Sequence, residues 1–193
     1  MPKIKKTACF WSTKNDLLKE YHDKEWGFPV HDDNKHFEML TLEGAQAGLG
    51  WETILKKRAG YQKLFKEFDP AKVAEMSDAE LEQCLKDENI IRNRNKVYSV
   101  RQNADVFLEI QKEFGSFDQY IWNFFNKQQI INQFKTDEDV PKETEGSKKL
   151  SEDLKKRGMA FIGPTSIYAY MQAVGIVVDH SIDCPRYPAC KMS

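Results

Sequence analysis

Residues 34 to 49 constrain the fold more than any other stretch of the chain. The segment reads NKHFEMLTLEGAQAGL, and on a helical wheel its apolar residues leave few polar sides. A helix of this kind is stable only when neighbouring elements cover it, because its apolar faces must be removed from water. We therefore predict a central and largely buried helix over residues 34 to 49.

The segments that follow this helix carry helix signals of their own. A second helix is predicted to start at Glu52 and to run through LKKRAGYQKLFKEF. Pro70 in FDPAKVAEM has the position of a first helical residue, and Ser77 and Glu80 have the spacing of a capping box. RNKVYSVRQNADVFLEIQKEFG predicts a long amphipathic helix closed by Gly115, and FDQYIWNFF predicts a short aromatic one.

The last third of the chain begins with a polar stretch, residues 127 to 147, which predicts an exposed loop. SKKLSEDLKKRG, FIGP and TSIYAYMQAVG then predict a helix, a tight hairpin and another helix. Nowhere do apolar and polar residues alternate long enough to predict a sheet, so the fold class is all-α. No repeat or shift in composition divides the chain, and we expect one domain over residues 1–193.

Composition and charge exclude several classes of protein. Apolar residues make up 40% of the chain and charged ones 31%, which is the balance of a globular protein rather than a disordered one. The net charge of -1 shows no overall preference for a polyanion, so any nucleic-acid surface must be local. No apolar run has membrane-spanning length, and MPKIKKTACFW lacks the apolar stretch of a secretory signal. We expect a cytoplasmic protein without a membrane partner.

Two pairs of metal-ligand residues lie near opposite ends of the chain. Cys9 and His22 are near the start, and His180 and Cys184 are four residues apart near the end. Together they form the Cys2His2 set of a closed tetrahedral zinc site, which would join the chain ends and leave no position for a reacting water. The alternative is two buried thiols and two unrelated histidines, and Cys190 is a possible substitute for Cys184.

The hairpin segment FIGPTS, residues 161 to 166, offers a way to hold a phosphate. Pro164 suits the first turn of a helix, whose free backbone N–H groups can bind a DNA phosphate without reading its sequence. The alternative is a plain connector with solvated basic faces. Two basic clusters favour the first interpretation: Lys155, Lys156 and Arg157 before the hairpin, and Arg92, Arg94 and Lys96 in NIIRNRNK.

Glu43 is an unusual residue in the predicted central helix, because it falls on nearly one face with Leu40, Ala47 and Trp51. Burial of an unpaired carboxylate is costly, so the alternatives are a partner cation or an exposed helix edge. Three further aromatic residues bracket His22 in the sequence: Trp11, Tyr21 and Trp26. Flat rings with one carboxylate would bind a flat cationic heterocycle, although aromatic clusters are also ordinary core.

Six segments, in order and over nearly the whole chain, resemble the 3-methyladenine DNA glycosylase I family. They are CFW, EYHDKEWGFPV, FEMLTLEGAQAGLGWETILKKR, NIIRNRNK, KKRGMAFIGPTSIYAYMQAVG and DHSIDC. The resemblance implies a helix-hairpin-helix DNA glycosylase fold whose N- and C-termini are joined by a structural zinc site. It also implies a DNA repair hydrolase that flips 3-methyladenine out of alkylated DNA, breaks its N-glycosidic bond and leaves an abasic site.

The resemblance also implies roles for individual residues. Glu43 and Tyr21 would be the catalytic pair that hydrogen-bonds the excised base, and its stacking partners would be Trp51, Trp11 and Trp26. Contacts with DNA would come from Gly163, Thr165, Lys156 and Arg157. The zinc ligands would be Cys9, His22, His180 and Cys184. For Asp179 we expect a contact with the imidazole of His180 rather than a catalytic role.

Two other functions remain open from the residues alone. One is a non-catalytic, zinc-stapled helix-hairpin-helix DNA-binding module, which has no use for Glu43 facing Trp51. The other is a glycosylase of broader alkylpurine scope, which would also release 7-methylguanine or 3-methylguanine. In either enzyme reading we expect alkylated double-stranded DNA as the partner, one structural Zn²⁺ per chain, no organic cofactor and a monomer.

Overall fold

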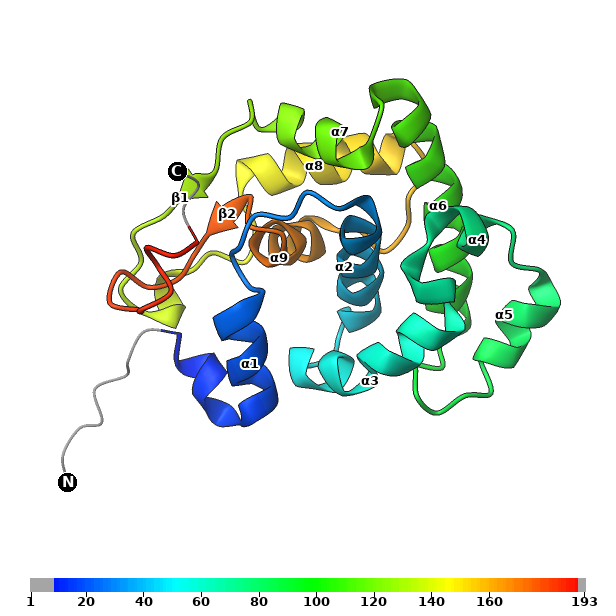
Figure 1. Cartoon of the computed structure of the whole chain (residues 1–193), viewed down its shortest axis with the longest axis horizontal. Coiled ribbons are helices and arrows are strands. Elements are labelled where there is room, and N and C mark those ends of the chain that lie inside the picture. The colour runs from blue at the N-terminus through cyan, green and yellow to red at the C-terminus, as the bar shows by residue number, and fades with distance from the viewer. Residues whose placement is uncertain (1–8, 191–193) are drawn as a thin grey trace.

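Helix α2 (Asp33–Gln46) lies at the centre of the molecule, as the apolar segment predicts (Figure 1). The structure is a computed structural model that describes residues 9–190. Nine of the residues from His36 to Ala45 are buried. The helix packs against helices α3, α6, α7 and α9. It ends three residues earlier than predicted, because Gly48 has φ 81° and the chain turns away.

The other elements surround α2. In chain order they are η1 (Phe10–Lys14), α1 (Asp16–Lys24), α3 (Trp51–Leu64), η2 (Lys66–Phe68), α4 (Pro70–Ala74), α5 (Asp78–Cys84), α6 (Arg94–Phe114), α7 (Phe117–Phe124), β1 (Ile130–Ile131), η3 (Asp137–Asp139), α8 (Glu145–Lys156), α9 (Pro164–Ala173) and β2 (Val177–Val178). Three end signals are confirmed. Pro70 opens α4, Ser77 and Glu80 form the capping box of α5, and Gly115 closes α6 with φ 90°.

The prediction of an exposed loop over residues 127 to 147 is only partly right. The stretch contains β1 and η3, and α8 already begins at Glu145. Strand β1 pairs in parallel with β2, with Ile130 opposite Val177. Two residues per strand are too few for an alternating pattern, so the sequence could not reveal this pairing. The fold is otherwise helical, in agreement with the all-α class.

Stacked aromatic rings join the central helix to its neighbours. The rings of Phe107 in α6 and Phe117 in α7 stack with centroids 4.1 Å apart, and Phe37 of α2 meets Phe107 edge-on at 5.3 Å. All three side chains are fully buried. This core holds α2 in place, so that the opposite end of the helix can present polar side chains to a cavity.

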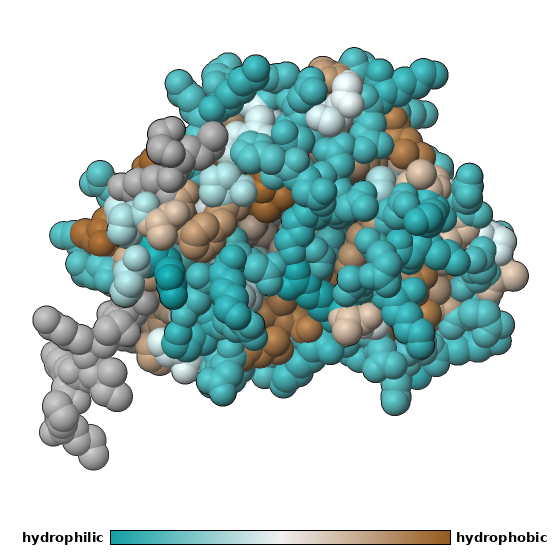
Figure 2. Space-filling view, in the orientation of Figure 1, coloured by the Kyte–Doolittle hydropathy of each residue, from teal (hydrophilic) through white to brown (hydrophobic). Residues whose placement is uncertain are grey.

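The N-terminal elements and the last segment of the chain lie on the same side of the molecule (Figure 1). Polar side chains cover most of the face shown in Figure 2, and apolar residues emerge between them only in patches. Between residues 9 and 190, no helix is long and apolar enough to cross a membrane. Among the described residues, five large apolar ones are exposed: Phe10, Leu49, Ile130, Ile131 and Ile182.

Candidate active site

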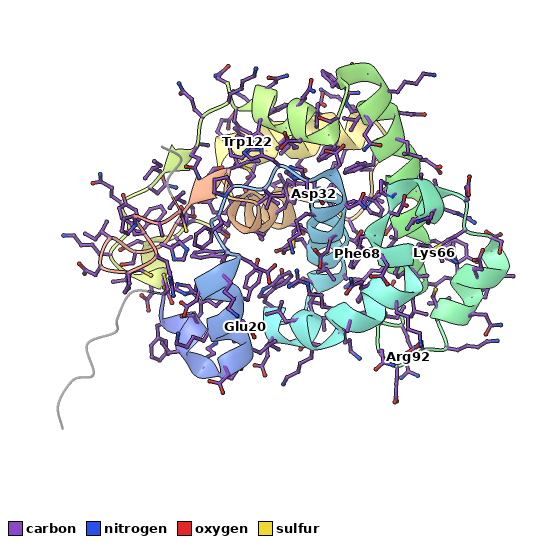
Figure 3. The ribbon with its side chains drawn as sticks, in the orientation of Figure 1. Glu20, Asp32, Lys66, Phe68, Arg92 and Trp122 are labelled. Carbon is purple, nitrogen blue, oxygen red and sulfur yellow. The ribbon has the colours of Figure 1, made fainter. Side chains whose placement is uncertain are left out.

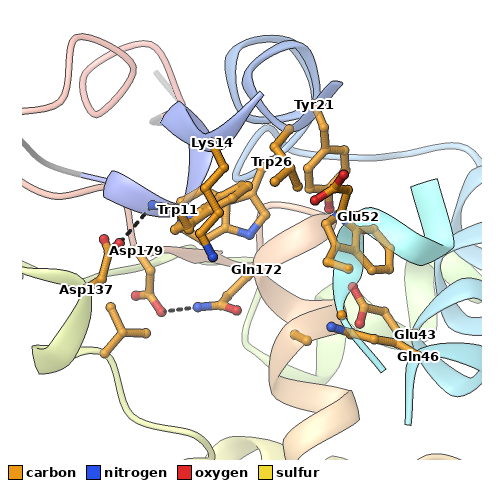
Figure 4. Close-up of a pocket in the computed structure, with 15 residues that line it drawn as sticks. Trp11, Lys14, Tyr21, Trp26, Glu43, Gln46, Glu52, Asp137, Gln172 and Asp179 are labelled. Atoms are coloured by element: carbon orange, nitrogen blue, oxygen red, sulfur yellow. Dashed lines mark hydrogen bonds between the residues drawn. The ribbon is translucent and has the colours of Figure 1, made fainter. Parts of the chain in front are cut away.

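A cavity of about 450 Å³ opens between η1 and α1 on one side and α2, α3 and α9 on the other. Its volume falls in the range of about 300 to 1,000 Å³ that is typical of small-molecule sites. Figure 4 shows Trp11 and Trp26 on one side of the cavity, with Glu43 and Gln46 across from them. All five aromatic and acidic residues that the resemblance assigns to the base line it: Trp11, Tyr21, Trp26, Glu43 and Trp51.

Three polar atoms in this cavity are buried without a hydrogen-bond partner. They are Oη of Tyr21, Oε2 of Glu43 and Nε1 of Trp51, and no other buried side-chain nitrogen or oxygen of residues 9–190 lacks one. Buried polar groups in native proteins are nearly always paired. Since the three atoms come from α1, α2 and α3 and meet in one cavity, they indicate a ligand that both donates and accepts hydrogen bonds.

No cation of residues 9–190 pairs with Glu43, and its side chain is buried, so the alternative of a paired or exposed carboxylate is wrong. The side chain is 4% exposed, and burial raises its pKa to about 8. Near neutral pH this burial therefore favours the neutral acid. A cationic ligand would reverse this preference, because a nearby positive charge stabilises the carboxylate.

The hydroxyl of Tyr21 stays protonated across the physiological range. Burial, and then the nearby Glu43 carboxyl group, raise the pKa of Tyr21 well above its ordinary value. Its ring lies 5.3 Å from that of Trp51, whereas Trp11 and Trp26 meet edge-on at 5.1 Å. The rings thus provide apolar surfaces, and the Tyr21 hydroxyl can donate a hydrogen bond.

Helix α1 presents Tyr21 to the cavity and the next residue, His22, to a second cluster of side chains. Asn15 caps the helix by accepting a hydrogen bond from the backbone N–H of Leu18. Successive residues on a helix point about 100° apart. Tyr21 therefore faces the cavity, while His22 faces the residues at the other end of the chain.

The four residues with metal-ligand chemistry come together, as the sequence predicts. One ligand atom from each of Cys9, His22, His180 and Cys184 lies within 4.8 Å of the others, and all four residues are buried. The distance between His22 Nε2 and His180 Nδ1 is 3.1 Å, and Cys184 Sγ is 3.5 Å from each. Ideal zinc bond lengths in a tetrahedron place two nitrogens about 3.3 Å apart, and a nitrogen and a sulfur about 3.5 Å apart. The group therefore fits a zinc ion.

The remaining nitrogens of the two imidazoles have partners of their own. His22 Nδ1 lies 2.8 Å from a carboxylate oxygen of Asp23, and His180 Nε2 lies 2.8 Å from the carbonyl of Trp26. The predicted contact between Asp179 and the His180 imidazole is wrong. Adjacent side chains of extended backbone point to opposite sides, so Asp179 faces the cavity instead.

Asp179 is held by three neutral donors. Its carboxylate accepts hydrogen bonds from the hydroxyl of Tyr168 at 2.6 Å, from Gln172 at 2.8 Å and from Asn132 at 2.7 Å. The bond from Gln172 is drawn in Figure 4. These contacts connect α9, the residue after β1 and the cavity wall, and they fix the segment that leads into His180.

Cys190 is buried but lies outside the group of four. Its thiol points to the carbonyl of Trp26 at 3.8 Å, and burial raises its pKa to about 12. The structure thus brings Cys184, and not Cys190, into the metal-ligand group.

The hairpin between α8 and α9 is fixed from beneath. The amide of Asn103 in α6 exchanges two hydrogen bonds with the backbone of Ala160, at 2.8 and 2.9 Å, and Ser151 donates to the carbonyl of Ile162 at 2.6 Å. Gly163 precedes Pro164, the first residue of α9, and no side chain caps this helix. A Cβ at Gly163 would meet nothing within 4 Å, so the helix N-terminus is open to a ligand.

The basic residues near the hairpin divide into free and engaged ones. Lys156 and Thr165 are exposed. Arg157, in contrast, forms ion pairs with Glu113 at 2.6 Å and Asp153 at 2.9 Å. Its guanidinium is therefore used within the fold, and its contact with DNA stays a prediction.

The second basic cluster is also mostly engaged. Arg94 pairs with Glu82, and the ammonium of Lys96 donates to two backbone carbonyls at the end of α2. Arg92 is exposed at the edge of the molecule (Figure 3). Only Arg92 of this cluster is thus available for a phosphate.

Several cavity residues escaped sequence reasoning. Gln46 is one helical turn beyond Glu43, so the helical period could have revealed it. Lys14 is the one cation among the lining residues that the structure describes, and Asp137 and Val140 come from the polar loop. Asp137 reaches the cavity by accepting a hydrogen bond from the backbone N–H of Trp11 at 3.1 Å. No local pattern in the loop signals this contact.

The sequence and the fold match one family of DNA repair proteins. The family model described as methyladenine glycosylase matches residues 11–187. The chain therefore belongs to the methyladenine glycosylase family.

The relatives to which the chain is similar are DNA-3-methyladenine glycosylases. The chain is 44% identical to the DNA-3-methyladenine glycosylase of Haemophilus influenzae, over 97% of this chain and 99% of the relative. It is 43% identical to DNA-3-methyladenine glycosylase 1 of Escherichia coli, over 95% and 98% of the two chains. A crystal structure of a point variant of 3-methyladenine DNA glycosylase I in complex with 3-methyladenine is similar with a TM-score of 0.90 and 33% identity, covering 93% of this chain and 97% of the other.

Proposed function

We infer that this chain removes 3-methyladenine from alkylated DNA by hydrolysing the N-glycosidic bond. The observation that carries the inference is the trio of unpaired polar atoms in an aromatic cavity, Tyr21 Oη, Glu43 Oε2 and Trp51 Nε1. A damaged adenine supplies what they lack, because its edge has an amino donor and ring-nitrogen acceptors. Relatives of 43% and 44% identity over nearly the full chain carry this activity in their names.

The charge of the substrate explains the carboxyl group of Glu43. Methylation at N3 places a positive charge on the adenine ring, and a cation beside a buried carboxyl group favours its ionised form. We propose that Glu43 accepts a hydrogen bond from the adenine edge and balances this charge. A neutral adenine would not offset the cost of ionising Glu43, so the same residue contributes to selectivity for the damaged base.

The remaining roles follow from the same geometry. We propose that Trp51 stacks on the base, that Tyr21 donates a hydrogen bond to it, and that Trp11 and Trp26 close the opposite side. A water molecule adds to C1′ of the sugar as the bond to the base breaks. The electron pair of that bond returns to the ring and neutralises its charge, and the water gives up one proton. The cationic base is already a good leaving group, so the protein chiefly has to extrude and hold it.

Contacts with the duplex are proposed for the open N-terminus of α9. There the backbone N–H groups after Gly163 would bind a phosphate, with Thr165 and Lys156 beside them. Leu49 is 41% exposed in the loop that leads from α2 to Trp51. We propose that this side chain occupies the gap that the flipped nucleotide leaves in the stack.

We propose that Cys9, His22, His180 and Cys184 hold one structural zinc ion. Four protein ligands leave no open coordination position, so the ion would stabilise the fold and take no part in the reaction. The site would fasten η1, which carries Trp11 and Lys14, to the segment after β2. A single glycosylase domain that acts as a monomer in the cytoplasm stays a prediction.

The test is release of base from methylated duplex DNA, followed by chromatography of the products. We expect 3-methyladenine as the main product of the wild-type protein and a large loss of release in Glu43→Gln. Binding of the duplex without any release would identify a non-catalytic module. Release of 7-methylguanine or 3-methylguanine at a comparable rate would identify a glycosylase of broader scope.

A further inference from the structure

Lys96 lies in the first turn of α6, in a segment that looks like a basic DNA contact, but its ammonium points into the fold. It donates hydrogen bonds to the carbonyls of Ala45 at 2.9 Å and Ala47 at 2.7 Å. The last carbonyls of a helix have no partner within the helix. The negative end of the helix dipole lies there as well and stabilises a nearby cation. Lys96 therefore caps the C-terminal end of α2 from another helix.

The capped end of α2 is the part of the helix that forms the cavity. Gln46 lines the cavity, residues 47 to 50 form the loop with exposed Leu49, and Trp51 begins α3 and lines the cavity again. Within the loop, a Cβ on Gly48 or Gly50 would meet nothing within 4 Å, so the loop packs loosely.

Few contacts restrain this loop. The backbone N–H of Leu49 donates to the carbonyl of Gln46 at 2.6 Å, which closes one turn. Among residues 9–190, Lys96 supplies the only side-chain hydrogen bonds to residues 45–50. Lys96 thus adds to the backbone turn the side-chain contacts that hold the end of α2 and the start of the loop.

We propose that Lys96 is a positioning residue of the glycosylase reaction, a role that rests on the proposed function. By fixing the loop between Glu43 and Trp51, it holds the carboxylate and the stacking ring at the separation that the base requires. The ammonium is occupied by two carbonyls, which argues against a contact with a phosphate.

The experiment compares Lys96→Met, which keeps the aliphatic chain and removes the donors, with Lys96→Arg, which restores donors and charge. Lys57→Met is the matched control, because Lys57 also donates to a backbone carbonyl, that of Glu88, and it does not line the cavity. Three quantities are measured: the single-turnover rate of 3-methyladenine release, the affinity for a duplex with an abasic-site analogue, and hydrogen exchange of residues 47–51.

For Lys96→Met we expect release to slow by about 10- to 100-fold, as is typical when positioning groups move by about 1 Å. Amides in residues 47–51 should exchange faster, and affinity for the duplex should change by less than about threefold, because phosphate contacts elsewhere are unaltered. Lys96→Arg should recover most of the rate, and Lys57→Met should match the wild type. If Lys96→Met does not fold, Lys96→Gln, which can still donate to one carbonyl, takes its place.

Two results would overturn the proposal. One is wild-type release and exchange in Lys96→Met. The other is a loss of duplex affinity with a salt dependence lowered by about one charge, which would make Lys96 a phosphate ligand. Absence of base release from the wild-type protein would instead reject the proposed function, and the exchange measurement would still test the cap.

Discussion

The ring of Tyr21 lies 5.3 Å from the ring of Trp51, with an angle of 55° between the two planes. One residue belongs to α1 and the other begins α3, and each has an unpaired polar atom in the cavity. The two residues therefore form one wall of the cavity, although they come from different helices. This wall offers both apolar surface and hydrogen-bond donors.

Replacement of Trp51 tests the stacking role. Loss of an aromatic platform costs about 1 to 3 kcal/mol per base, so Trp51→Ala should bind free 3-methyladenine about 5- to 150-fold more weakly. Trp51→Phe should retain part of the affinity, because it keeps a ring but lacks the indole N–H. Titration calorimetry with the free base measures both. Equal affinity of Trp51→Ala and wild type would show that the ring does not touch the base.

The rate of base release should depend on the ionisation of Glu43. Burial raises the pKa of Glu43 to about 8 in the free protein, and the carboxylate is the form that binds a cationic base. Consequently kcat/KM should rise about tenfold per pH unit below pH 8 and level off above it. In Glu43→Gln this inflection should be absent and the rate low throughout. A wild-type profile without an inflection near pH 8 would contradict the role of Glu43.

The same residue should destabilise the free protein, and the sign follows from its pKa. In the unfolded chain Glu43 ionises at its ordinary pKa of 4.5, whereas in the fold it stays neutral up to about pH 8. Stability is therefore lost as pH rises from 4.5 to 8, by an amount on the order of a few kcal/mol. Glu43→Gln avoids this loss, so its advantage in melting temperature over wild type should be larger at pH 8 than at pH 5. Thermal unfolding of both proteins at the two pH values measures the difference.

The metal-ligand group predicts a distinction between two neighbouring cysteines. Native mass spectrometry should find one zinc per chain in the wild type and in Cys190→Ala, but none in Cys184→Ala. Loss of the ion should lower the melting temperature by about 10 °C, since a structural metal contributes several kcal/mol to folding. Zinc retention in Cys184→Ala would show that Cys190 replaces it.

Substitution of Gly163 should weaken binding of duplex DNA without changing the stability of the fold. Its φ of -59° suits any residue, and an added Cβ would meet no protein atom within 4 Å. Gly163→Ala should therefore unfold within about 0.5 kcal/mol of wild type. Its methyl group would stand where a phosphate approaches the α9 N-terminus, so affinity for a duplex should fall about tenfold. An unchanged affinity would place the phosphate elsewhere.

The sequence predicts well those features that follow from a local apolar pattern or from residue types that are scarce in the chain. The apolar period of α2 places Glu43 in the interior. The expectation that Trp51 lies on the same helix face is wrong, because α2 ends at Gln46 and Trp51 begins α3, although both side chains line the cavity. The chain has only four cysteines and four histidines, so Cys9 and His180 suggest a shared metal ion although they are far apart in sequence. In these cases the chemical requirement is specific, so distance along the chain matters little.

The sequence does not predict contacts between side chains that are far apart along the chain and meet only in the fold. Arg157 and Lys96 sit in basic clusters that suggest DNA contacts, but Glu113 engages one and the carbonyls of α2 engage the other. Asp137 belongs to a polar loop with no pattern, yet it reaches the backbone of Trp11. Each of these contacts forms between segments that only the finished fold brings together.

The meeting of Cys9 with His180 changes how the chain is connected. These residues are 171 positions apart, and His22 and His180 are 158 apart, so a metal bound to all four ligands turns almost the entire chain into a ring. A cut in the loop between β1 and α8 would open that ring and leave the two fragments tethered through the ion. Mild proteolysis should thus yield a nicked but undivided molecule, because the ion joins the two fragments in addition to the packing of α2 against α9.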